Sequence, residues 1–227
     1  AIGQTFEQAI MKAARGAEVG VKSLNLPVFE EENDESIKAR VAHCTDQRIF
    51  AIFQAIKRGI LTLEEIHSIT KIAMWFLRKL QNLANIEHHL EKDDLTVELY
   101  AKAKNLGYPD AVIEKISGKK IIGSGGNLAE AEKAAALVKE GKLAHLPSSF
   151  KMVDTCAGEF NAETPYFYAT YDAENEAKEH LSAKPSSGKG TIIVLGSGPI
   201  RIGQGIEFDY ASVQCVWALK RLGYDVV

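Results

Sequence analysis

The segment of the sequence with the clearest chemical potential is a glycine-rich turn at residues 196–205. It reads Gly-Ser-Gly-Pro-Ile-Arg-Ile-Gly-Gln-Gly. Glycines let a ligand approach the backbone closely, and the free amides at the start of a following helix favour an anion. We therefore expect a substrate or anion site at this turn, and its candidate residues are Gly196, Gly198, Arg201, Gly203 and Gln204. A glycine turn can also serve only to join a strand to a helix, so both interpretations stay open.

A standard dinucleotide site is disfavoured at this turn. The fingerprint of such a site needs glycine or alanine at the position of Arg201. Arg201 itself is either a partner for a carboxylate or phosphate, or an ordinary surface arginine.

Three other segments match functional motifs only in part. The glycines of 123–126 look like a phosphate loop, but we favour Asn127 as the cap of the next helix as their explanation. Residues 188–191 look like the end of a Walker loop, yet no glycine precedes them at the required spacing, which indicates a linker. His88 and His89 lack the His-x-x-x-His spacing of a helical metal site, so we predict a solvated face and no metal.

The elements that must position the turn are a strand before it and a helix after it. Thr191–Leu195 is a continuous run of mostly β-branched residues, of the kind buried in a parallel sheet. A helix is predicted from about Phe208 to Leu222, and Tyr224–Val227 begins a second strand. Strand, turn, helix and strand form the first βαβ unit of a doubly wound α/β fold.

The chain upstream of this unit is predicted to be mainly α. Apolar residues recur at helical spacing between residues 24 and 145, which indicates a bundle of helices with short connections. Capping boxes are expected at Thr5–Gln8 and Thr62–Glu65. Trp75 and Phe76 are expected in the core, with an inter-chain patch as the alternative. The predicted helices cover about 5–20, a short stretch after 33–34, 46–58, a short stretch after 62, 70–91, 95–105, 109–117 and 128–140.

The stretch between the bundle and the βαβ unit has a different composition. Residues 151–171 hold many Tyr, Phe and Thr residues, which suggests an extended segment packed along a neighbouring surface. Its polar residues Asp154, Thr155 and Glu159 are expected to form structural hydrogen bonds there. Residues 184–190 are predicted to be a polar linker.

The overall composition is that of a soluble globular protein. The 227 residues are 46% hydrophobic and 25% charged, and the net charge of −3 gives no reason to expect nucleic acid or an anionic membrane as a partner. Cys44, Cys156 and Cys215 are odd in number and far apart, so we expect buried, reduced thiols in a cytoplasmic protein. The missing initiator Met and the strand-like end suggest an internal fragment.

Three segments, in order along the chain, resemble the large chain of carbamoyl-phosphate synthase. Residues 198–210 are similar to the signature that opens the second, carbamoyl-phosphate-forming half, although bacterial members commonly have Asn at the place of Ile200. Residues 150–171 resemble the segment that joins the oligomerisation domain to that half. Residues 1–20 resemble the closing helix of the first, carboxyphosphate-forming half, with Gln4 where Arg is usual.

The resemblance implies a division of the chain into three parts. Residues 1–22 would end the first half, 23–183 would form the helical oligomerisation domain with its junction segment, and 184–227 would begin the pre-ATP-grasp domain of the second half. Residues 118–147 match the family poorly. The family's large chain uses two ATP, with Mg²⁺ or Mn²⁺, bicarbonate, and ammonia from a glutaminase small chain. It forms homo-oligomers and serves arginine or pyrimidine synthesis; we expect this fragment to hold no cofactor and to be inactive alone.

Two residues of the turn acquire a specific role from the resemblance. Positions that match Gly205 and Glu207 lie in the family where carbamate enters the second half. A glycine at 205 would leave that passage open. The alternative is that the backbone conformation at this position requires glycine. Glu207 would orient carbamate by hydrogen bonding. The alternative is that its negative charge only stabilises the helix, by about 0.3–1 kcal/mol, through its place at the positive N-terminal end.

Two hypotheses from other classes remain. The chain could be a stand-alone helical interaction module whose last residues form a docking arm. It could also be a small nucleotide-binding oxidoreductase, which would need an acidic residue after the second strand, and the sequence ends at Val227 before showing one.

Overall fold

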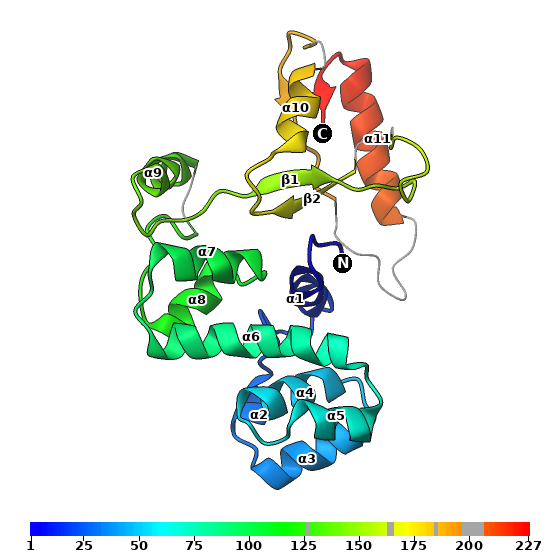
Figure 1. Cartoon of the computed structure of the whole chain (residues 1–227). Helices are drawn as coiled ribbons and strands as arrows, with labels where there is room; N and C mark the ends of the chain where they lie inside the picture. Colours follow the sequence, from blue (N-terminus) through cyan, green and yellow to red (C-terminus); the bar gives the residue numbers. More distant parts are fainter. Residues whose placement is uncertain (126–127, 163–165, 184–185, 197–206) are drawn as a thin grey trace. The chain divides into compact units, whose positions relative to one another are not determined.

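The structure is a computed structural model that describes residues 1–125, 128–162, 166–183, 186–196 and 207–227 (Figure 1). It divides into two compact units: Ala1–Glu176, here the helical unit, and Ala177–Val227, the C-terminal unit. The helical unit is mainly α and the C-terminal unit contains a small parallel β-α-β arrangement, so the predicted fold class is confirmed. Within the described ranges, no helix has both the length and the apolar character needed to cross a membrane.

The first helix begins close to its predicted position. α1 (Phe6–Gly16) is capped by Thr5, whose side chain accepts a hydrogen bond from the Gln8 amide at 3.2 Å. The reciprocal bond differs from the prediction, because the Gln8 side chain accepts from the Gln4 amide, at 3.0 Å. The helix ends before the predicted stop at Gly20.

Four shorter helices follow; three lie close to predicted positions, whereas the sequence did not predict the first, α2. They are α2 (Pro27–Glu30), α3 (Asp34–Ala42), α4 (Arg48–Lys57) and α5 (Leu63–Thr70). Asn33 caps α3 by accepting from the Ser36 amide at 2.9 Å. The capping box of α5 is confirmed: the Thr62 side chain accepts from the Glu65 amide, and the Glu65 carboxylate accepts from the Thr62 amide at 2.8 Å.

The longest helix, α6 (Met74–Lys92), contacts α1, α4, α5, α7 and α8 and forms the centre of the helical unit (Figure 1). It starts later than predicted because Lys71 adopts a left-handed conformation with φ of 61° and ends α5. The expectation that Trp75 and Phe76 lie in the core is wrong, since they are 54% and 43% exposed. Trp75 and Phe76 lie in the first turn of α6. Helical spacing places Phe76 on the same face as Leu80 and Leu83, so the rotation of the helix does not by itself account for the exposure of its ring.

The helical unit continues with α7 (Val97–Asn105), α8 (Asp110–Ser117) and α9 (Leu128–Lys139), as the sequence predicts. Gly107, between α7 and α8, has φ of 93°, and a Cβ added there would lie 3.2 Å from the Cβ of Met11. Glycine therefore allows this loop to pack closely against α1.

An antiparallel hairpin closes the helical unit. β1 (Ser149–Met152) pairs with β2 (Phe167–Thr170), with Ser149 opposite Thr170. The sequence indicated an extended segment at 151–171 but not this pairing. Between the strands, Asp154 is exposed and accepts a hydrogen bond from the Cys156 amide at 3.0 Å. This bond closes a local turn, whereas the sequence analysis expected Asp154 to bond to a neighbouring surface.

The C-terminal unit carries the predicted β-α-β arrangement. Its elements are α10 (Glu176–Ala183), which begins at the unit boundary, β3 (Thr191–Ile192), α11 (Glu207–Arg221) and β4 (Asp225–Val226). The strands are parallel, with Thr191 opposite Asp225, and the pairing continues where the Val194 amide donates to the Val227 carbonyl at 2.8 Å. The sequence did not predict α10.

Two predictions of burial are wrong. Ile193 and Leu195 are 69% and 87% exposed, because a two-stranded sheet has too few neighbours to cover both of its faces. Cys44 and Cys215 are also exposed, although all three cysteines are free thiols as expected.

Candidate functional site

The predicted anion turn lies mostly outside the described residues. Gly198, Arg201, Gly203, Gln204 and Gly205 all fall there, so their roles stay predictions. Gly196 is described and exposed; its φ lies outside the left-handed region, and an added Cβ would meet no atom within 4 Å. The backbone at 196 therefore does not itself require glycine.

The two elements expected to hold the turn are present. β3 leads into it, and Glu207 is the first residue of α11, which confirms a helix that begins there. Negative charge is favourable at a helix N-terminus. The role of the Glu207 side chain stays a prediction, because its placement lies outside what the structure describes. Gly223, with φ of 84°, ends α11 as predicted.

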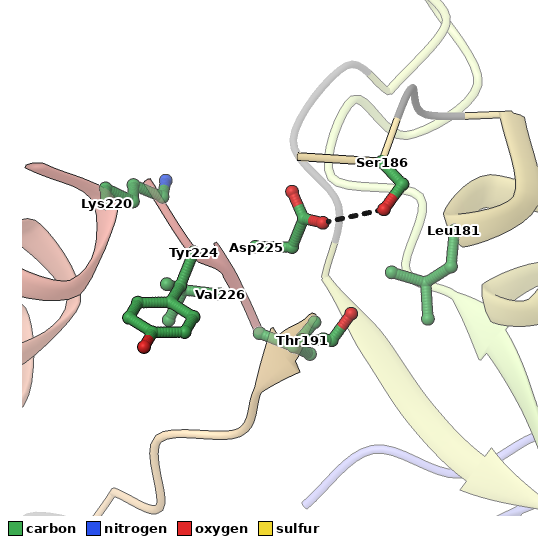
Figure 2. Close-up of a pocket in the computed structure, with 8 residues that line it drawn as sticks. Leu181, Ser186, Thr191, Lys220, Tyr224, Asp225 and Val226 are labelled. Atoms are coloured by element: carbon green, nitrogen blue, oxygen red, sulfur yellow. Dashed lines mark hydrogen bonds between the residues drawn. The ribbon is translucent and has the colours of Figure 1, made fainter. Parts of the chain in front are cut away.

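A hollow of about 380 Å³ lies beside β3 and β4 in the C-terminal unit (Figure 2). Asp225 accepts hydrogen bonds from the amide and the hydroxyl of Ser187, both at 3.0 Å, and from the Ser186 hydroxyl at 3.5 Å. The bonds from Ser187 lower the pKa of the Asp225 carboxyl. These contacts attach the predicted linker to β4, which is a structural role for Asp225.

The helical unit contains a buried charged group that the sequence did not reveal. The Glu87 carboxylate lies 2.7 Å from Lys57 Nζ and accepts hydrogen bonds from Tyr108 Oη at 3.0 Å and from Asn25 Nδ2 at 2.8 Å. Burial, and then Glu87, raise the pKa of Tyr108 well above its usual value. Burial alone would lower the pKa of Lys57, but the carboxylates of Glu87 and Glu91 raise it.

A second polar cluster surrounds Asp110, at the start of α8. Its carboxylate accepts from Lys104 Nζ at 2.7 Å and from Tyr100 Oη at 3.1 Å, and lies 2.5 Å from His145 Nδ1. Burial would raise the pKa of Asp110, but the hydrogen bonds from Lys104 and His145 outweigh it, and the pKa is lowered. The only sequence signal was the spacing of Tyr100 and Lys104 on one face of α7.

An aromatic patch, defined as Phe6, Trp75 and Phe76, lies on the surface of the helical unit. The Phe6 ring centroid is 5.5 Å from that of Trp75 and 5.3 Å from that of Phe76. Lys79 Nζ lies 5.4 Å from the Trp75 ring centroid. Exposed apolar patches with a polar rim are typical of protein interaction surfaces.

The two adjacent histidines of α6 make separate contacts. His88 Nε2 lies 2.8 Å from the Lys57 carbonyl, and His89 Nδ1 lies 2.7 Å from the Asp93 carboxylate. Among the described residues, no group of three His, Cys, Asp or Glu side chains could hold a metal ion.

Comparison with known families gives two matches. Residues 1–124 match the model of the carbamoyl-phosphate synthetase large chain, oligomerisation domain. Residues 188–227 match the carbamoyl phosphate synthase preATP-grasp domain. The first match falls within the helical unit and the second within the C-terminal unit.

Proposed function

Because the chain belongs to the carbamoyl-phosphate synthetase large-chain family, we propose that it supplies self-association and the entry to the carbamoyl-phosphate-forming half of such a large chain. One observation carries the proposal: an oligomerisation domain and a preATP-grasp domain are matched in this order. The alternative of a stand-alone helical interaction module does not account for the second match.

The parent protein in this proposal is a cytoplasmic ATP-dependent carbon–nitrogen ligase. It makes carbamoyl phosphate from bicarbonate, ammonia and two ATP, with Mg²⁺ or Mn²⁺, and a glutaminase small chain supplies the ammonia. Its product serves arginine or pyrimidine synthesis. The residues that contact ATP belong to other parts of the parent, so the chain alone has no ligase activity.

The proposed division of the chain is 1–22, 23–183 and 184–227. The match to the oligomerisation domain begins at residue 1 and includes Phe6, Trp75 and Phe76 alike. We assign the aromatic patch, in which Trp75 and Phe76 stay exposed, to contact with another copy of the chain.

The proposed role of the turn is to admit carbamate to the second half. Gly205 has no side chain to narrow the passage, and Glu207, at the start of α11, orients carbamate by hydrogen bonding. Carbamate hydrolyses in water, so its passage has to exclude solvent.

Two measurements on the 227-residue chain test the proposal. Sedimentation at increasing concentration is expected to show a rising average mass; a monomer at every concentration would contradict self-association. Incubation with ATP, Mg²⁺, bicarbonate and ammonia is expected to yield no carbamoyl phosphate, and turnover would contradict the assignment of the ATP sites to other parts.

A further inference from the structure

A pocket of about 360 Å³ lies in the helical unit, between α1, the loop from α7 to α8, and the end of β2. Three basic side chains line it: Lys12 and Arg15 from α1, and Lys104 from α7. Asp110 is the sole acidic residue among the described residues of its lining. This excess of basic groups occurs in a chain whose net charge is −3.

The one carboxylate of the pocket is already engaged. Asp110 accepts from Lys104 and Tyr100 and lies against His145. In the described part of the chain, no carboxylate forms an ion pair with Lys12 or Arg15. The positive charges from α1 therefore lack a matching negative charge.

Lys12 and Arg15 are held in place by neutral backbone groups. Lys12 Nζ donates to the Ala169 carbonyl at 2.6 Å, and Arg15 Nη1 donates to the Gly107 carbonyl at 3.0 Å. Burial lowers the pKa of both groups, and Arg15 lowers that of Lys12 further. Removing positive charge from water without a counter-ion is unfavourable, so an anion in the pocket would stabilise both side chains.

The remaining wall of the pocket is largely apolar. The Tyr171 ring centroid lies 4.6 Å from Lys104 Nζ, and the pocket also contains Pro109 and Tyr108. The Tyr108 hydroxyl is used in the core, where it donates to Glu87, so it is not free to bind a ligand. Such a site suits a ligand that joins an anionic group to a small apolar body.

We propose that this pocket binds a small organic anion, a carboxylate or a phosphate monoester. Lys12 and Arg15 hold the oxygens of its charged group, because guanidinium and ammonium groups form strong charge-assisted hydrogen bonds to such oxygens. Its apolar body lies against Tyr171 and Pro109. The inference rests on the pocket alone and does not depend on the proposed function.

Calorimetric titration of the 227-residue chain tests the proposal with benzoate, phenyl phosphate, inorganic phosphate and benzyl alcohol. Benzoate or phenyl phosphate is expected to bind saturably, with a Kd of about 1 mM or below. Benzyl alcohol is expected not to bind. Absence of saturable binding of both aromatic anions up to about 10 mM would overturn the proposal. Equal binding of benzyl alcohol would overturn the role of charge, and equal binding of inorganic phosphate would overturn the role of the apolar body.

Variants locate the binding site. Lys12→Gln and Arg15→Gln are each expected to weaken binding at least about tenfold, the loss typical of one charge-assisted contact. Arg78→Gln removes the same charge from an exposed position of α6 and should leave binding unchanged. Arg15 also donates to the Gly107 carbonyl, so Arg15→Gln could disturb the fold as well as the pocket. Ala169→Leu is therefore a further variant, because it keeps Lys12 and Arg15 and reduces the volume of the pocket. If the Ala169→Leu variant and the Lys12→Gln variant each bound the anion as tightly as the unchanged chain, this pocket would be excluded as the binding site.

Discussion

The ammonium of Lys57 lies 2.7 Å from the carboxylate of Glu87, whose side chain is fully buried at the centre of the helical unit. Tyr108 and Asn25 donate to the same carboxylate. The Glu87 carboxylate therefore joins three other segments of the chain, those that carry Asn25, Lys57 and Tyr108. Removing the Glu87 charge takes the charged acceptor from Tyr108 and Asn25 and leaves the partly buried Lys57 with Glu91 alone.

Glu87→Gln is accordingly expected to lower the free energy of unfolding by about 3 kcal/mol. The control is Glu91→Gln, which removes the other, more exposed partner of Lys57 and should cost less than about 1 kcal/mol. Urea unfolding at neutral pH measures both values. Equal effects of the two variants would contradict the central role of Glu87.

The lowered pKa of Asp110 predicts a specific dependence of stability on pH. A carboxyl whose pKa is lower in the folded state stabilises the fold above its unfolded pKa, about 4, and this contribution is lost as the pH falls through the folded value. Asp110→Asn should therefore destabilise the protein at neutral pH and flatten the loss of stability between about pH 5 and pH 2. Urea unfolding across this range is the measurement, with the exposed Asp46→Asn as control. An unchanged acid profile in Asp110→Asn would refute the prediction.

The aromatic patch should contribute more to association than to stability. Trp75→Ala is expected to cost about 1 kcal/mol through its ring contacts, whereas Leu80→Ala, fully buried on the same helix, should cost about 3 kcal/mol. Urea unfolding compares the two variants. Trp75→Ala should also weaken the binding of one copy of the chain to another, measured by sedimentation at increasing concentration. Unchanged binding would contradict the proposed contact.

The carbamate passage is tested in a complete large chain that carries this segment. Gly205→Tyr is expected to reduce carbamoyl-phosphate synthesis strongly while bicarbonate-dependent ATP hydrolysis by the first half continues, because the change obstructs transfer and leaves the first site intact. Gly16→Ala in α1 is the control, since the position lies outside the turn and an added Cβ has open space there. A parallel loss of both activities would indicate misfolding or a different role for Gly205.

Local sequence features predicted much of the secondary structure. The caps at Thr5 and Thr62 are confirmed. The helix after the glycine turn is also confirmed, as are the parallel strands that precede the turn and follow the helix. These features depend on hydrogen bonds and apolar spacing between residues close in sequence, so the sequence carries their signal directly. The family resemblance came from the order of three local segments along the chain and is confirmed by the family matches.

The tertiary structure alone decided which polar groups meet. Lys12 reaches the carbonyl of Ala169, 157 residues further along the chain, and Asn25 reaches Glu87 across 62 residues. It also decided that Trp75 faces outward, because the rotation of α6 is set by packing against several other helices. Contacts between distant segments leave no periodic pattern in the sequence, and they become visible only when the chain has folded.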